Sequence, residues 1–147
     1  MFEFEEDREH FEQVLRDNGG VDANSHLFDF RDPDQVKRKE FNSLRDKAFA
    51  DLKETYGSTC QLSCHPDCGK VGGVVDHLIP LSSNKLNKLI RGLKATADKK
   101  VPTQSFGSNH PDNFVLSCRR CNAFKSNKIP TTEMINLIFQ HRRNKAA

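Results

Sequence analysis

The sequence lacks tryptophan, has one tyrosine and two methionines among its 147 residues, and is only 35% hydrophobic. It also lacks any run near the ~18 apolar residues that a membrane span needs. The first ten residues, MFEFEEDREH, are acidic where a secretory signal would be basic and then apolar, so we expect a cytoplasmic protein. These absences argue against a membrane protein, a protein exported by such a signal and a collagen-like chain.

Charge is distributed unevenly, although the net charge is only +3. Residues 1–56 contain nine Lys or Arg and fifteen Asp or Glu, a net charge of −6, whereas residues 57–147 contain fourteen and five, a net charge of +9. A concentrated positive segment suits a phosphate-rich partner, although charge clusters are more often solvated surface. We predict an acidic helical extension over residues 1–56 and a second, basic domain over residues 57–147.

Hydrophobic periodicity predicts helices over residues 2–18 and from Pro33 to about residue 55, separated by a loop over 21–32. Strands are expected over 73–81, where Pro80 breaks the pattern, and over 114–116. A helix follows from Arg119 to about Lys128, and a last helix opens at Pro130. Residues 82–110 are rich in Lys, Asn and Ser and are predicted to be an insertion or loop with one short helix.

The five cysteines are grouped as metal ligands often are. Cys118 and Cys121 are separated by two residues, and Cys64 and Cys68 by three, so the two pairs offer four thiolates to one structural zinc ion. Gly69 permits the tight backbone turn after Cys68. Cys60 with Cys64 is an alternative first pair, and the neighbouring His65 is another candidate ligand. Disulfides fit poorly with an odd cysteine count and no export signal.

Three polar stretches surround these cysteines: VVDHLIPLS over 74–82, HPDNFVLSC over 110–118 and CRRCNAFKSNK over 118–128. Together they resemble the HNH endonuclease family over roughly residues 60–130. The family pattern has an Asp-His pair ending a first strand, an Asn opening a second, and a His or Asn at the start of the next helix. Asp76-His77, Asn113 and Asn122 occupy these positions.

The resemblance implies an α+β fold: a ββα-metal finger held by a four-cysteine zinc site, with an N-terminal helical extension and a C-terminal helix. It implies that His77 is the general base, that Asp76 and Asn122 hold a catalytic Mg²⁺ or Mn²⁺, and that Asn113 orients the His77 loop by hydrogen bonding. These residue types suit the chemistry, because an imidazole accepts a proton at neutral pH and hard oxygen ligands suit these cations. A regular strand would turn Asp76 and His77 to opposite faces, so we expect the chain to bend near Pro80.

The helix that holds Asn122 is also basic. Its first-turn N–H groups and dipole favour a phosphate, and Lys125 lies on the same face as Asn122. We expect four basic side chains in this region to contact the DNA backbone: Arg119, Arg120, Lys125 and Lys128. His110 is close to the motif, but we expect it to be a loop residue rather than a ligand.

The sequence therefore predicts a metal-dependent DNA endonuclease that hydrolyses phosphodiester bonds, such as a restriction, mobile-element or phage nicking enzyme. The alternatives are a non-catalytic, zinc-dependent nucleic-acid-binding module and a zinc-bearing protein-interaction domain. Cutting both strands of a duplex would require a homodimer, for which the N-terminal helices offer one interface.

Overall fold

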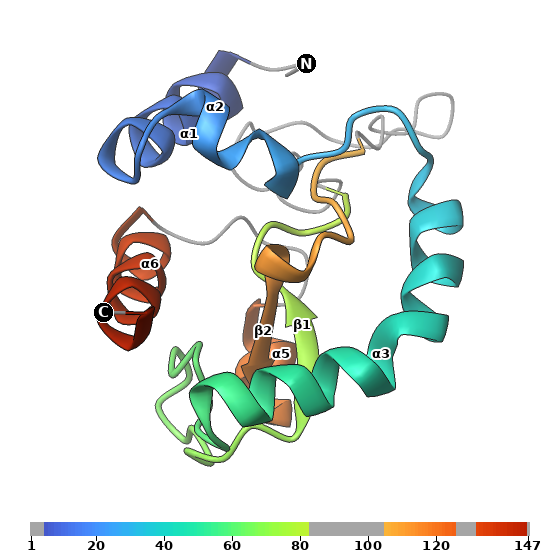
Figure 1. The fold of residues 1–147 in the computed structure, drawn as a ribbon, viewed down its shortest axis with the longest axis vertical. Helices are drawn as coiled ribbons and strands as arrows, with labels where there is room; N and C mark the ends of the chain where they lie inside the picture. The colour runs from blue at the N-terminus through green and yellow to red at the C-terminus, as the bar shows by residue number, and fades with distance from the viewer. Residues whose placement is uncertain (1–4, 83–104, 126–131, 147) are drawn as a thin grey trace, which may run out of the picture.

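The computed structural model describes residues 5–82, 105–125 and 132–146 and has a mixed α and β architecture (Figure 1). Its elements, in chain order, are α1 (Glu5–Asp17), α2 (Val21–Asn24), a 3₁₀ turn η1 (Ser25–Leu27), α3 (Asp34–Tyr56), β1 (Val74–His77), a 3₁₀ turn η2 (Pro111–Asn113), β2 (Phe114–Ser117), α5 (Arg119–Lys125) and α6 (Thr132–Ala146). The general α+β prediction is confirmed. Most of the predicted 82–110 insertion, and Lys128, lie outside the described residues.

The sheet consists of two antiparallel strands, in which Val74 pairs with Ser117 and His77 pairs with Phe114. The predicted strand over 73–81 is too long, because β1 ends at His77. Beyond that point the backbone bonds to Asn113 instead of continuing the ladder. The Leu78 N–H donates to the Asn113 backbone carbonyl at 2.8 Å, and the Ile79 N–H donates to the Asn113 side-chain carbonyl at 2.8 Å.

Helix α3 covers one face of this small sheet. Phe41, Ala48 and Leu52 of α3 pack with three buried apolar side chains of the strands: Val75, Phe114 and Leu116. The helix ends at Gly57, whose φ of 81° is a conformation that other residues adopt only with strain. The predicted helix ending near residue 55 is therefore close to the observed one.

A second apolar cluster joins the two ends of the chain. Phe11 and Val14 of α1, both buried, share this cluster with Ile135 and Ile138 of α6 and with Leu78 just after β1. Residues 1–56 thus contribute side chains to both apolar clusters of the fold. The apolar face of α1 packs on α6.

The connection over residues 21–32, predicted as a loop, contains two short helical turns, α2 and η1. A buried amide stabilises them: the Asn24 side chain donates to the carbonyls of Asn18 and Gly20, both at 2.9 Å. Side-chain-to-backbone hydrogen bonds of this kind leave no pattern of apolar residues in the sequence, so apolar periodicity does not predict these two turns.

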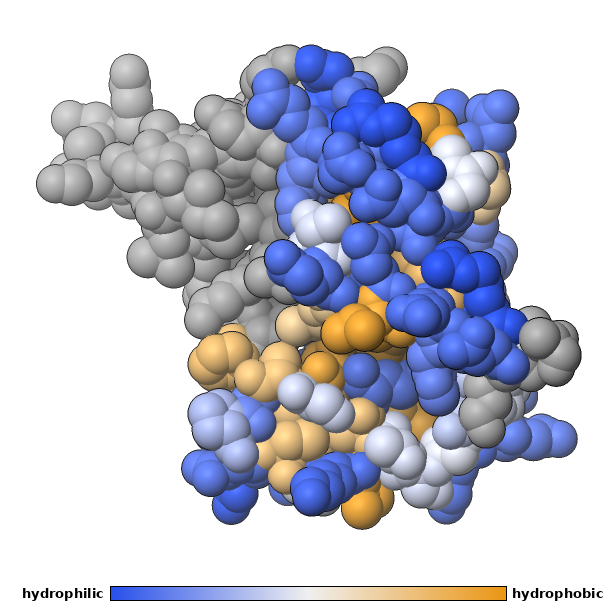
Figure 2. Space-filling view, turned by 90° about the vertical axis from the view of Figure 1, so that its left-hand side faces the viewer, coloured by the Kyte–Doolittle hydropathy of each residue, from blue (hydrophilic) through white to orange (hydrophobic). Residues whose placement is uncertain are grey.

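One side of the molecule has an apolar hollow. A cavity of about 660 Å³ lies between α6 and residues 59–64, and Leu137 beside it is 65% exposed. Figure 2 shows apolar side chains gathered in the lower half of this face. Among the described residues, no helix is both long and apolar enough to cross a membrane.

Candidate functional site

Four cysteines meet at the junction of β2, α5 and the segment that precedes β1. The sulfur atoms of Cys60, Cys68, Cys118 and Cys121 all lie within 4.8 Å of one another. Three of these cysteines are predicted ligands, but the fourth is Cys60 instead of Cys64. The pair Cys60 and Cys68 is neither the favoured pair, Cys64 with Cys68, nor the alternative, Cys60 with Cys64. The local backbone explains the difference, because the Cys60 N–H donates to the Lys70 carbonyl at 3.0 Å and Thr59 bridges Val71. This short antiparallel contact sets Cys60 opposite the Cys68 turn.

Cys64 lies beside the cluster, half-buried, with its thiol pointing to the Cys121 carbonyl at 3.7 Å. A protonated thiol is a weak donor, so this contact suits a cysteine that is not a thiolate ligand. His65, the other candidate ligand, contributes its backbone N–H, which donates to the Cys121 sulfur at 3.5 Å.

Backbone N–H groups point at all four sulfurs of the cluster. These donors are Ser63 and Cys118 to Cys60 (3.4 and 3.2 Å), Lys70 to Cys68 (3.3 Å), Gly69 and Cys121 to Cys118 (both 3.4 Å), and His65 to Cys121 (3.5 Å). Hydrogen bonds of this kind stabilise a thiolate, so the peptide chain is arranged for four negative sulfurs. Two of these donors, Ser63 and Lys70, have left-handed backbone conformations, with φ angles of 44° and 62°.

A cation would stabilise the deprotonated, buried thiols of this cluster. Burial raises the pKa of the Cys60 and Cys121 thiols to about 11, whereas N–H donors from Cys121 and Gly69 lower the pKa of Cys118 to about 6. A divalent ion offsets the cost of burying thiolates, because its charge stabilises the deprotonated form.

One sulfur–sulfur distance matches that of a zinc site. A tetrahedral ion with Zn–S bonds of ~2.3 Å places its sulfur ligands about 3.8 Å apart. The Cys118 and Cys68 sulfurs are 3.8 Å apart. Four cysteines within metal-binding distance are therefore consistent with a structural zinc site that ties residues 60–68 to the start of α5.

Asp76 and Asn122, the predicted ligands of the catalytic cation, lie on neighbouring elements and are both half-buried. Asp76 is the third residue of β1, and its Oδ1 accepts the His77 N–H at 2.8 Å. Asn122 projects from α5, which packs on β1, and lines a cavity of about 420 Å³. The start of β1 and α3 form the rest of its lining: Phe41, Arg45, Asp46, Phe49, Gly73, Val74 and Val75.

His77, the predicted base, is buried on the opposite face of β1, under α3. The ladder stays regular through the His77–Phe114 pair, so Asp76 and His77 point to opposite faces, and the backbone leaves the ladder only beyond His77, in the segment where the bend near Pro80 is expected. The imidazole is 8% exposed and packs against the rings of Phe41 and Phe114, with centroid distances of 4.5 and 5.3 Å.

A carboxamide holds the His77 ring in place. His77 Nε2 lies 2.8 Å from the Asn109 side-chain oxygen. The Asn109 amide nitrogen donates to the Lys37 carbonyl at 2.8 Å and to Glu40 at 3.2 Å, which fixes the amide orientation. The Nε2 atom is therefore the protonated nitrogen, donating to Asn109. Sequence reasoning missed Asn109, because a polar loop residue 32 positions after His77 has no distinguishing signal.

Asn113 is fully buried and hydrogen-bonded on both ends of its amide. Besides accepting the Ile79 N–H, it donates to the carbonyls of Ile79 at 3.0 Å and Ser108 at 2.8 Å. It therefore fixes the segment that follows His77 against the loop that precedes β2.

The predicted DNA-binding residues are only partly described. Arg119 and Arg120 are exposed, and Arg120 donates to the Asp67 carbonyl at 3.0 Å, beside the cysteine cluster. The side chain of Lys125, like the whole of Lys128, lies outside the described part of the chain.

No known family model matches this chain, and no curated protein or solved structure is significantly similar to it. The assignment of a function therefore rests on the residues and their geometry.

Proposed function

We propose that this protein is a metal-dependent DNA endonuclease of the HNH type. The supporting observation is the placement of the motif residues: Asp76 lies in β1, Asn113 ends η2 directly before β2, and Asn122 lies in α5, with the cysteine cluster where β2 meets α5. In this proposal the strand–strand–helix order corresponds to the ββα-metal unit of the family.

Asp76 and Asn122 would hold Mg²⁺ or Mn²⁺, since one carboxylate and one amide oxygen leave positions for water and a phosphate oxygen. The cation would supply positive charge near the leaving oxygen of the scissile phosphodiester. Asn113 would position the segment after His77 through the hydrogen bonds described above.

His77 would accept the proton of the attacking water. In the described conformation its Nε2–H is donated to Asn109, and the ring is covered by Phe41 of α3. Catalysis by Nε2 therefore requires the ring to leave Asn109 when DNA binds, which makes α3 and the Asn109 loop the elements that control access to the base.

DNA is the proposed partner, because the net charge of +9 over residues 57–147 matches a polyphosphate. Duplex cleavage would use two copies of the chain, one for each strand.

The burial of His77 favours a second candidate function, a zinc-dependent nucleic-acid-binding module without catalysis. Such a module needs the cysteine cluster and the basic surface, but it has no use for an accessible imidazole.

The two proposals are separated by incubating zinc-loaded protein with supercoiled plasmids carrying random inserts, with Mg²⁺ or Mn²⁺. The nuclease is expected to convert them to nicked or linear forms, and Asp76→Asn and His77→Ala should each cut at least ~100-fold more slowly. Asp67→Asn, an exposed carboxylate beside the cysteine cluster, is the matched control and should cut normally. Binding without cutting supports the second candidate, and equal cutting by wild type and Asp76→Asn contradicts the assigned site.

A further inference from the structure

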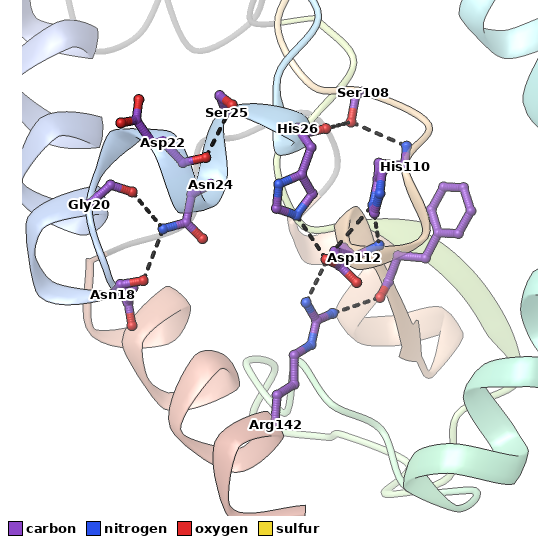
Figure 3. Close-up of polar contacts among 11 residues, drawn as sticks. Asn18, Gly20, Asp22, Asn24, Ser25, His26, Ser108, His110, Asp112 and Arg142 are labelled. Atoms are coloured by element: carbon purple, nitrogen blue, oxygen red, sulfur yellow. Dashed lines mark hydrogen bonds and ion pairs between the residues drawn. The ribbon is translucent and has the colours of Figure 1, made fainter. Parts of the chain in front are cut away.

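Outside the cysteine cluster, three metal-ligating side chains from distant parts of the chain converge on the surface. His26 belongs to η1, while His110 immediately precedes η2 and Asp112 lies within it (Figure 3). One donor atom from each residue lies within 4.8 Å of the other two. We propose that these residues form a second metal site, specific for a transition-metal ion such as Zn²⁺, Co²⁺ or Ni²⁺.

The distances are close to those of a metal site. His26 Nε2 lies 2.8 Å from Asp112 Oδ2, and His110 Nδ1 lies 3.8 Å from the same oxygen. Tetrahedral coordination with bonds of ~2.0–2.1 Å separates ligand atoms by about 3.3 Å, so the observed pairs lie on either side of the required value. The remaining pair, between the two imidazole nitrogens, lies within 4.8 Å.

The donor types select the kind of ion. Two imidazoles and one carboxylate suit zinc, cobalt and nickel, whereas Mg²⁺ prefers an all-oxygen shell. The Asp112 N–H donates to His110 Nδ1 at 3.1 Å, so this nitrogen has a lone pair instead of a proton. A cation at this nitrogen would take the place of the Asp112 N–H, which caps η2 in the structure.

Hydrogen bonds already hold the backbone segments that carry these three ligands. Ser108 links the two segments, because its hydroxyl donates to the His26 carbonyl at 2.6 Å and accepts the His110 N–H at 3.2 Å. Arg142 of α6 donates to the carbonyls of Asp112 and Phe114 (Figure 3). Little ordering would thus be left for the metal to impose.

The site is open to solvent, and Asp112 supplies its one carboxylate. The side chains of His26, His110 and Asp112 are 33%, 44% and 60% exposed, which leaves room for an ion to enter and for water ligands to complete its shell. Arg142 is the nearby positive group; its guanidinium donates to backbone carbonyls, and its charge also interacts with the Asp112 carboxylate. Without a metal, the same atoms form only an exposed contact between His26 and Asp112.

The experiment uses untagged protein whose cysteine site has first been filled with one equivalent of zinc. Titration with Co²⁺ or Ni²⁺ should then show one further equivalent by calorimetry. The bound Co²⁺ should show visible d–d bands but no near-ultraviolet sulfur-to-metal charge transfer. At ~100 times the dissociation constant, the ion should raise the melting temperature by about 5–10 °C.

Asp112→Asn preserves the shape of the side chain and should weaken this binding at least ~100-fold, as should His26→Ala. The control is His141→Ala, which removes an exposed histidine of α6 outside the cluster and should bind the second equivalent normally. Each variant is first checked for an unchanged zinc content and a cooperative thermal transition. The proposal is overturned if wild type takes up no second equivalent, if Asp112→Asn binds it as tightly as wild type, or if charge transfer shows that cobalt has entered the cysteine site.

Discussion

Exchanging single cysteines for serine distinguishes the four-cysteine cluster of the structure from the zinc-ligand set that spacing alone favoured. Cys60 is 2% exposed, and its sulfur accepts two backbone N–H bonds, at 3.2 and 3.4 Å. Serine would place a neutral hydroxyl where the thiolate ligand lies, so both N–H groups would donate to an uncharged acceptor. Bonds to a charged acceptor contribute about 1 kcal/mol more than neutral ones, so the two together cost about 2 kcal/mol, or roughly 30-fold in zinc affinity. Cys60→Ser should therefore bind zinc at least that much more weakly.

Cys64→Ser is the matched substitution. The Cys64 thiol makes a 3.7 Å contact with a backbone carbonyl, which a serine hydroxyl can replace, so zinc affinity should change by less than ~3-fold. Affinities are measured by competition with a chromophoric chelator, and zinc stoichiometry by native mass spectrometry. The reasoning is refuted if Cys64→Ser loses zinc while Cys60→Ser retains it.

Four further predictions concern the fold and the assembly. Asn113→Ala leaves three buried backbone groups without their side-chain partner, so it should lower the free energy of unfolding by about 3–5 kcal/mol in urea titrations. The control Asn42→Ala changes an exposed asparagine and should alter this free energy by less than ~0.5 kcal/mol. Gly107→Ala would put a Cβ 2.0 Å from a backbone oxygen and should lower the melting temperature far more than Gly73→Ala, whose Cβ meets nothing within 4 Å. Burial lowers the pKa of Lys37 in the folded protein below 10.5, so the unfolded chain binds the proton more tightly than the folded one. The free energy of unfolding should therefore rise as the pH approaches 10.5. Urea titrations at several pH values should show this rise in wild type and not in Lys37→Met. Light scattering should detect a dimer on duplex DNA, and a monomer throughout the titration would contradict two-copy cleavage.

The long helix was the element best predicted from sequence. Its start near Pro33 and its end at Gly57 are both local chemical signals, and the apolar residues between them repeat at helical spacing. The start was still misjudged by one position, because Pro33 lies at the N-cap and Asp34 is the first helical residue.

The cysteine cluster was predictable in kind but not in its first ligand. Spacing favours Cys64, whereas the observed choice depends on how Cys60 pairs with Lys70 across a short backbone turn. Sequence separation does not show which thiol such a turn directs inward.

The environment of His77 was beyond sequence reasoning for a similar reason. Alternation along β1 correctly indicates opposite faces for Asp76 and His77, and the bend that would bring them together does not occur before His77. The partners that hold the imidazole, Asn109 and Phe41, are distant in sequence and meet it only through the packing of α3.

The central claim, that Asp76 and Asn122 hold a hard divalent cation, is tested most directly by paramagnetic Mn²⁺ in nuclear magnetic resonance spectra of zinc-loaded, ¹⁵N-labelled protein. Substoichiometric Mn²⁺ should broaden the amide signals of Asp76, His77 and Asn122 first, and Asp76→Asn should abolish that selective broadening. Broadening confined to other regions, or unchanged in Asp76→Asn, would contradict the claim.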